Sequence, residues 1–242
     1  MMRVEAFIIA YNESEIIPMT IKHYQKYCSK ITIFDNHSTD NTAKIAESMG
    51  CEVRTFGKPG ELNDQHYLDV KNHAWKVSKA DWVIVCDADE ILFEPNMNFI
   101  LKSEMMHGST IIKTKGWGIY SESMPLNDFL EVQTCVEDKN YSKSVIFNPA
   151  KIKEIGYIFG CHECRPAGVV NYSKETIHLL HYKYIGGIDR VLNRHRNYKS
   201  RLSEINKRWN LGHTYSQPEE EQIAWYKKCL ESSKTLSEHG IL

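Results

Sequence analysis

The sequence has no hydrophobic run long enough to cross a membrane. A spanning helix needs roughly 18 consecutive apolar residues, and no segment of the 242 residues approaches that length. The opening Met1-Met2-Arg3 leads straight into a strand-like segment, without the apolar core and small-residue cleavage site of a signal peptide. We therefore expect a cytoplasmic protein that is at most peripheral to a membrane.

Net charge is also nearly absent. The 30 Lys and Arg residues almost balance the 31 Asp and Glu residues, which leaves a formal charge of −1 at pH 7. Bulk electrostatic binding to nucleic acid or to an anionic membrane therefore has no support. The sequence shows no internal repeat, and its seven scattered cysteines are expected to be reduced thiols.

The composition is that of an ordinary globular protein, with 42% hydrophobic and 25% charged residues. In the first half of the chain, expected strands alternate with expected helices. The strands are 4–10, 31–34, 51–56 and 82–86, and the helices are 16–27, 42–49 and 65–78. This alternation predicts an α/β fold with a mostly parallel central sheet flanked by helices.

The second half has a more mixed pattern. Strands are expected at 110–115, 144–147, 155–158 and 176–184, followed by helices from residue 188 and from Pro218 to about residue 237. We place a first domain at 1–185 and a C-terminal helical extension at 186–242.

The segment 82–90 combines a buried strand with acidic residues. The unbroken apolar run of residues 82–86 predicts a strand covered on both faces, and Asp87, Asp89 and Glu90 follow it. In open α/β sheets, ligands bind beyond the carboxyl ends of the strands. Asp87 and Asp89 could therefore both reach one hard divalent cation, Mn²⁺ or Mg²⁺.

Three strand-end motifs together resemble GT-A glycosyltransferases, most closely the family 2-like group. They are Ala10-Tyr11-Asn12-Glu13, Asp35-Asn36-His37-Ser38-Thr39-Asp40 and Asp87-Ala88-Asp89-Glu90. The resemblance covers about residues 3–93, and the later His181-Tyr182 is similar to a histidine of the same group. It implies a GT-A fold, a nucleotide-diphosphate sugar donor with UDP-sugar favoured, Mn²⁺ or Mg²⁺, and glycosyl transfer to a hydroxyl of a glycan, a lipid-linked or another acceptor.

Candidate donor-binding residues follow the first two strands. The base and ribose are expected to bind near Ala10, Tyr11, Asn12, Glu13, Asp35 and Asn36. Asp35 would accept a hydrogen bond from ribose or uracil, whereas capping and turn formation are the alternative roles of Asn12 and Asn36. Lys183 could contact phosphate or simply be an exposed lysine.

The metal is expected to bind to Asp87, Asp89 and His181, and Asp89 would thereby act in catalysis. His178 and His181 point to opposite faces of an extended strand, so one of them could be packed in the core. An inverting transfer, which the resemblance implies, also needs a carboxylate base. Glu163 is the first candidate, with Asp128 and Glu131 in reserve and His162 as a possible assistant, whereas Glu90 is expected to orient the metal loop.

Three aromatic residues, Trp117, Tyr120 and Trp209, could lie against an acceptor sugar, although core packing is the alternative for each. The pair Cys161 and Cys164 is a weak zinc signal without a second ligand pair. The basic residues between 190 and 208 are typical of a solvated helix face, with contact to anionic lipid as the alternative.

Two other functions remain open. A metal-dependent phosphotransferase or nucleotidyltransferase could use the same two aspartates on phosphate. A non-catalytic carbohydrate- or nucleotide-binding module could retain the fold without the activity.

Overall fold

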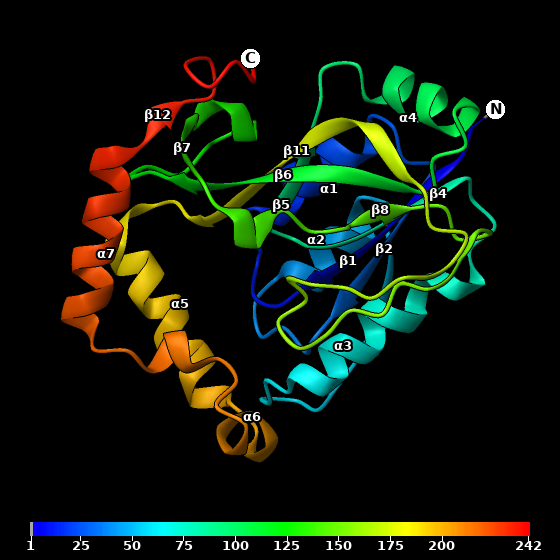
Figure 1. The fold of residues 1–242 in the computed structure, drawn as a ribbon. Helices are drawn as coiled ribbons and strands as arrows, with labels where there is room; N and C mark the ends of the chain where they lie inside the picture. Colours follow the sequence, from blue (N-terminus) through cyan, green and yellow to red (C-terminus); the bar gives the residue numbers. More distant parts are fainter. Residues whose placement is uncertain (1) are drawn as a thin grey trace.

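The computed structural model describes residues 2–242, and one ten-stranded sheet dominates it (Figure 1). The strands lie in the order β12-β7-β6-β8-β4-β1-β2-β3, and β11 pairs with both β5 and β6. The first part of this sheet is parallel. Its strands are β1 (Val4–Ala10), β2 (Lys30–Asp35), β3 (Glu52–Thr55) and β4 (Trp82–Asp87).

Beyond β4 the sheet becomes mixed. The remaining strands are β5 (Glu90–Phe93), β6 (Ile111–Tyr120), β7 (Thr134–Glu137), β8 (Ile146–Phe147), β11 (Tyr172–Tyr184) and β12 (Lys234–Thr235). β11 runs parallel to β6 and antiparallel to β5. A separate antiparallel pair is formed by β9 (Ile152–Glu154) and β10 (Ala167–Gly168).

Helices cover both faces of the parallel strands. They are α1 (Ile17–Gln25), α2 (Thr42–Ser48) and α3 (Asp64–His73), with a 3₁₀ turn at Ala74–Val77. Successive side chains of a strand point to opposite faces, so Ile8 of β1 packs in the cluster with α1, whereas Phe7 and Ile9 pack in the cluster with Trp75. The predicted α/β architecture, with a central sheet flanked by helices, is confirmed.

Between β5 and β8 the chain also contains one helix and two 3₁₀ turns. The helix is α4 (Met97–Met106), and the 3₁₀ turns are Phe129–Glu131 and Lys139–Tyr141. Met97 and Leu101 of α4 are buried in the same cluster as α1. The expected strand at 155–158 is wrong, because β9 ends at Glu154 and Gly156 follows with a φ of 65°, outside the strand region.

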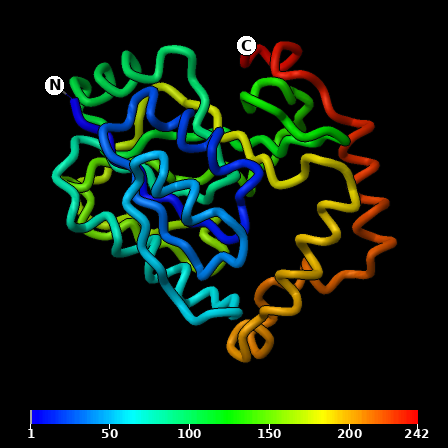
Figure 2. Tube along the Cα trace, turned by 180° about the vertical axis from the view of Figure 1, so that it is seen from behind, coloured from blue at the N-terminus to red at the C-terminus, as the bar shows by residue number. Residues whose placement is uncertain are grey.

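The C-terminal segment stands beside the sheet as an arm of helices, from yellow to red in Figures 1 and 2. It contains α5 (Gly187–Arg201), α6 (Glu204–Arg208), a 3₁₀ turn at His213–Ser216 and α7 (Glu219–Ser232). A hydrophobic cluster, made mostly of tyrosines, joins this arm to β6 and β11. It consists of Tyr120, Tyr141, Tyr184, Val191 and Tyr226.

The last helix is shorter than the sequence pattern predicts. The helix α7 ends at Ser232, and β12 then pairs antiparallel with β7 instead of continuing the helix to residue 237. Ser and Thr around this point are weak helix formers, and Leu236 becomes fully buried once the chain turns back to the sheet. No helix within residues 2–242 has the length and apolar character needed to cross a membrane.

Candidate active site

A cavity of about 840 Å³ opens at the carboxyl ends of β1 and β4. Its wall continues through β11 and the C-terminal arm, so the cavity lies between the sheet and the helices α5 and α7. Seven of the residues that the sequence predicted for the site line it, namely Ala10, Tyr11, Glu13, Asp87, Asp89, His181 and Lys183. Parallel strands that end at one edge bring their following residues together, as the sequence pattern predicted.

The turn between β4 and β5 carries the acidic motif and is fixed by its own hydrogen bonds. The amide of Asp87 donates to Glu90 Oε2 over 2.9 Å, and the amide of Ala88 donates to the carbonyl of Ile9 over 2.9 Å. The Asp89 carbonyl accepts from the amide of Tyr182 over 2.7 Å. The expected orienting role of Glu90 agrees with the first of these bonds.

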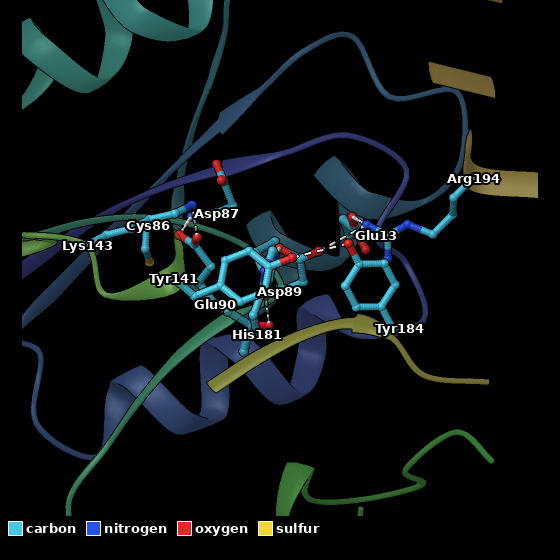
Figure 3. A network of polar contacts seen from close by, with 12 residues as sticks. Glu13, Cys86, Asp87, Asp89, Glu90, Tyr141, Lys143, His181, Tyr184 and Arg194 are labelled. Atoms are coloured by element: carbon cyan, nitrogen blue, oxygen red, sulfur yellow. Dashed lines mark hydrogen bonds and ion pairs between the residues drawn. The ribbon is translucent and has the colours of Figure 1, made fainter. Parts of the chain in front are cut away.

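Asp89 is buried and faces two basic side chains. Its Oδ1 lies 3.3 Å from His181 Nε2, and its Oδ2 lies 3.1 Å from Arg194 Nη2 (Figure 3). Burial alone would raise the pKa of Asp89, but the charges of His181, when protonated, and of Arg194 hold that pKa well below its ordinary value. Asp89 is therefore a carboxylate at neutral pH.

Asp87 points away from Asp89 and pairs with a lysine of α3. Lys71 Nζ lies 2.8 Å from Asp87 Oδ1 and 2.9 Å from Oδ2, and the lysine side chain is only 6% exposed. Burial acts to lower the pKa of Lys71, but Asp87 overcomes this effect and raises the pKa well above its usual value. The Asp87 side chain is 33% exposed, so it keeps access to the cavity.

A second buried ion pair lies beneath the turn. Lys143 Nζ donates to Glu90 Oε1, and both side chains are almost inaccessible to solvent. Burial acts to raise the pKa of Glu90, but Lys143 and Lys71 lower it to about 2. The floor of the site therefore consists of charges that are paired with one another.

The donor set for a divalent cation is present in part. Asp89 and His181 supply one carboxylate oxygen and one imidazole nitrogen that face each other, which are ligands that Mn²⁺ accepts. Within residues 2–242, no three His, Cys, Asp or Glu side chains are grouped closely enough to hold a metal ion by themselves. The residues present fit a cation that takes two protein ligands and completes its coordination with phosphate and water.

Two of the predicted donor-site residues shape the loops around the cavity. Asn12 adopts a φ of 52°, and its Oδ1 accepts from the amide of Thr39 over 2.7 Å. Asn36 donates to the carbonyl of Phe56 and accepts from the hydroxyl of Tyr67. These bonds span 20 or more residues of the chain, so both side chains join neighbouring loops instead of capping a helix or closing a turn.

Asp35 is nearly inaccessible, and one of its carboxylate oxygens accepts from the amide of Ser38 over 2.8 Å. Its other oxygen, Oδ1, is buried and has no hydrogen-bond partner among the described residues. A buried unpaired acceptor is costly, so this atom is available to a donor group of a ligand.

Glu13 follows β1 and is buried against Arg194. Its Oε1 lies 2.7 Å from Arg194 Nη2. Burial raises the pKa of Glu13 to about 7, although Arg194 acts to lower it. Glu13 is thus the acid of this site whose charge changes near neutral pH.

The predicted bases lie outside the cavity. Glu163 is exposed and is not among the described residues that line it, although its neighbour His162 is. Asp128 and Glu131 form a capping box on a 3₁₀ turn, and Asp128 borders a different cavity of about 520 Å³ near α1 and α4. The assignment of the base to Glu163 stays a prediction.

Asp138 is a cavity-lining acid that the sequence analysis passed over. It follows Glu137 at the end of β7, and its carboxylate accepts from the amide of Asn140 over 2.9 Å. No salt bridge to Asp138 is present among the described residues. No strand was expected at 134–137, so the acidic pair Glu137-Asp138 was the remaining sequence signal that could have revealed it.

The predicted acceptor aromatics have other environments. Trp117 and Tyr120 are buried, which is the core-packing alternative, and Trp209 is 61% exposed but is not among the described residues that line the cavity. Trp225 of α7 lines the cavity and is 41% exposed. Its ring packs edge-on against Tyr120 and Tyr184, which hold it in place.

The two histidines of β11 separate as the strand geometry requires. His181 faces the cavity, whereas His178 accepts a hydrogen bond from Trp117 Nε1 over 3.0 Å on the other side. Lys183 lines the cavity beside His181, with its Nζ 5.0 Å from the centre of the Tyr215 ring. Its contact with a phosphate stays a prediction.

The solvated-face interpretation of the basic helix is wrong for part of α5. Arg196 pairs with Glu219 at the surface, as expected. Arg190 and Arg194 instead turn toward the sheet and pair with Glu15 and Glu13. Sequence spacing would have shown that residues 190 and 194 share one helix face, but not that this face meets acids from the loop after β1.

An α/β sheet with acids at the end of its central strand and a histidine on a later strand agrees with the GT-A architecture that the strand-end motifs resemble. Residues 6–97 match the family model described as glycosyl transferase family 2. This match includes all three strand-end motifs and confirms the predicted resemblance for that segment of the chain.

Curated relatives are similar over the same segment. An uncharacterized glycosyltransferase of Rickettsia bellii is 34% identical over 90 residues, which cover 37% of this chain and 29% of the relative. Another from Rickettsia prowazekii is 34% identical over 92 residues, covering 38% and 30%. The chain thus matches less than a third of the length of these relatives.

Solved structures also show similarity. Residues 1–349 of S. aureus TarS align with a TM-score of 0.49 and 14% identity, covering 87% of this chain and 69% of that one. Glucosyl-3-phosphoglycerate synthase from Mycobacterium tuberculosis, in complex with Mn²⁺, UDP and phosphoglyceric acid, aligns with a TM-score of 0.36 and 19% identity, covering 48% and 43%.

Proposed function

We propose that this chain is a metal-dependent glycosyltransferase that moves a sugar from a nucleotide-diphosphate donor, with UDP-sugar favoured, to a hydroxyl of a glycan or another acceptor. The observation that carries the proposal is the Asp89 and His181 pair, which lies on the wall of a large cavity within a chain whose first 97 residues contain the family 2 segment. The inverting course is part of the same proposal.

In this proposal the donor nucleoside binds at the ends of β1 and β2. Tyr11 offers a ring at the cavity wall, and the unpaired Oδ1 of Asp35 would accept from a base or ribose donor group. Reaching Asp35 requires the side chains around Tyr11 to adjust, because Asp35 is only 2% exposed.

The diphosphate would lie near Asp89, Asp87 and His181. A divalent cation held by Asp89 and His181 would supply Lewis-acid stabilisation to the departing diphosphate. Lys71 pairs with Asp87 and holds its side chain in place, and the bonded turn fixes Asp89, so these side chains need little reorganisation when the donor binds.

The acceptor would enter from the side of the C-terminal arm. Trp225 presents a supported ring to the cavity, and the apolar face of a sugar packs well on such a ring. A base must then remove the proton of the attacking hydroxyl. Glu163 is the acid predicted from the sequence, and Asp138 is favoured by its place on the cavity wall.

The test is a screen of UDP-, GDP- and other nucleotide sugars with Mn²⁺, Mg²⁺ or EDTA. We expect a metal-dependent rise in melting temperature with a donor and the release of an intact nucleoside diphosphate on turnover. Release of a nucleoside monophosphate or a new phosphate ester would favour the phosphotransferase or nucleotidyltransferase instead. Donor binding without turnover on any acceptor or water would favour the binding module.

A further inference from the structure

The guanidinium of Arg194 is buried in the site with only part of its hydrogen-bonding capacity used. Its Nη2 lies within hydrogen-bond distance of Glu13 Oε1 at 2.7 Å, Tyr198 Oη at 3.0 Å and Asp89 Oδ2 at 3.1 Å. One NH₂ group has two hydrogens for these three acceptors. Its Nη1 is buried and has no partner among the described residues.

Unused donors on a buried charge are costly, so this arrangement indicates a missing acceptor. A buried charged donor without an acceptor costs more free energy than a neutral one. Arg194 lines the cavity and its side chain is 15% exposed, although Nη1 itself is buried, so a ligand would reach the guanidinium by replacing part of its contacts with Glu13 and Asp89. The missing acceptor therefore belongs to a ligand rather than to the protein core.

The surroundings of Arg194 indicate an anionic ligand. Arg194 and Lys183 both line the cavity, and Arg194 lies in contact with Asp89. Phosphate oxygens are strong acceptors, and the planar guanidinium binds them through two parallel hydrogen bonds.

Neighbouring contacts hold α5 in position for this role. Arg190 Nε lies 2.8 Å from Glu15 Oε2, one turn before Arg194 (Figure 3 shows Arg194 reaching toward Glu13). Two turns later, the guanidinium carbon of Arg201 lies 3.2 Å from the centre of the Tyr11 ring. Both contacts tie α5 to the loop after β1, so Arg194 is placed by the fold.

We propose that Arg194 binds the diphosphate of the donor, so that the C-terminal arm supplies a part of the donor site. This inference rests on the proposed function, because it assumes a nucleoside diphosphate in the cavity. In the structure, Glu13 and Asp89 contact the guanidinium of Arg194. When the donor binds, its phosphate oxygens would replace part of these contacts.

The test measures dissociation constants of UDP, inorganic pyrophosphate and uridine by calorimetry, in EDTA and in Mn²⁺. Arg194→Ala is compared with Arg196→Ala, the matched control on the solvent face of the same helix. We expect Arg194→Ala to weaken UDP and pyrophosphate at least 10-fold under both conditions and to leave uridine affinity unchanged. Arg196→Ala should bind all three probes like the wild type.

Arg194→Lys keeps the charge and protects the test against misfolding of the alanine variant, which circular dichroism would reveal. It should bind pyrophosphate with intermediate affinity, because lysine lacks the planar fork. If the folded Arg194 variants bound UDP and pyrophosphate as tightly as the wild type does, the role of Arg194 would be overturned, whereas the proposed function would stand. Failure of the wild type to bind UDP, GDP, CDP, ADP or pyrophosphate would overturn the proposed function as well.

Discussion

The two halves of the molecule contribute unequally to the charges of the cavity wall. The acids that end the strands, Glu13, Asp87 and Asp89, all come from the first half. Of the four lysines and arginines in the cavity wall, Lys143, Lys183 and Arg194 come from the second half, and Lys71 is the exception. The comparison shows that the segment matching the family model supplies the strand-end acids but only one of the four basic residues in the cavity wall.

The largest effect is expected for the acid that joins both halves. Asp89→Asn keeps the shape of the side chain but removes the charge that faces His181 and Arg194. Transfer activity should fall about 10³-fold, because charge stabilisation at the diphosphate is lost. Steady-state kinetics with the donor identified by the screen would measure it.

The control for this variant is Asp69→Asn on the exposed side of α3, which should retain full activity. If Asp89→Asn turned over like the wild type, neither the cation nor the charge balance at Asp89 would matter for the reaction.

The buried pair of Glu90, from the first half, and Lys143, from the second half, tests whether the two halves stabilise each other. Lys143→Met leaves Glu90 as an uncompensated buried charge and should lower the free energy of unfolding by about 3 kcal/mol. Lys30→Met breaks an exposed pair with Glu52 and should cost less than about 1 kcal/mol. Urea denaturation measures both variants.

The double variant Glu90→Gln with Lys143→Met should recover part of the loss, since the buried charge is gone. A Lys143→Met protein as stable as Lys30→Met would show that the two halves are not coupled through this pair.

The base can be assigned by comparing two acids of the second half. If Asp138 is the base, Asp138→Asn should reduce kcat about 10²-fold or more, with the affinity for the nucleoside diphosphate unchanged. Glu163→Gln should then have little effect, because Glu163 is exposed outside the cavity. The opposite result would establish Glu163 and would require its loop to move over the donor.

Two histidines, one in each half, connect stability to pH. Burial lowers the pKa of His23 on α1 and of His195 on α5 to about 4 each. In the unfolded chain a histidine titrates near 6.5, so the folded state binds fewer protons between pH 6.5 and 4. The contribution of each histidine to stability is complete above pH 6.5 and is lost as the pH falls.

His23→Gln should therefore reduce the loss of stability between pH 7 and pH 5 by about 2 kcal/mol, and His195→Gln should act in the same direction. Glu13 has the opposite effect on stability, because its raised pKa favours the folded state as the pH falls below 7. Since the wild type and both variants contain Glu13, its contribution cancels in the comparison. Differential scanning calorimetry would show one shifted transition in both variants if the arm and the sheet unfold together. Two separate transitions would show that the arm and the sheet unfold independently.

The smallest effect is expected at the acceptor side. Trp225→Ala should raise the KM for the acceptor roughly 2- to 10-fold, which corresponds to about 0.5–1.5 kcal/mol for one stacked ring. Trp209→Ala is the control, because it removes a more exposed tryptophan that follows α6, and it should leave the KM for the acceptor unchanged. Equal effects of the two substitutions would remove Trp225 from the acceptor site.

The first half of the fold was predictable because its elements depend on local signals. The apolar run of β4 and the turn residues that follow β2 mark strand ends without knowledge of the partner strand. Gly50 directly follows the helix expected at 42–49, and it has the φ of 83° that a helix-terminating glycine needs.

The second half depends on contacts between residues far apart in the sequence. That Arg194 would meet Glu13 could not be inferred from spacing, because 181 residues separate them. Lys71 was placed correctly on a helix, but only the packing of α3 against β4 brings it to Asp87. Sequence patterns therefore located the acids of the site and left their partners undetermined.

Two backbone hydrogen bonds join the loop after β3 to the chain beyond α5. The amide of Leu62 donates to the carbonyl of Arg201 over 2.7 Å, and the amide of Ser203 donates back to Leu62 over 2.9 Å. Contacts of such long sequence separation form slowly in folding. During synthesis on the ribosome, the parallel strands β1 to β4 can assemble early, whereas the cavity is complete only after the residues through Trp225 have left the exit tunnel.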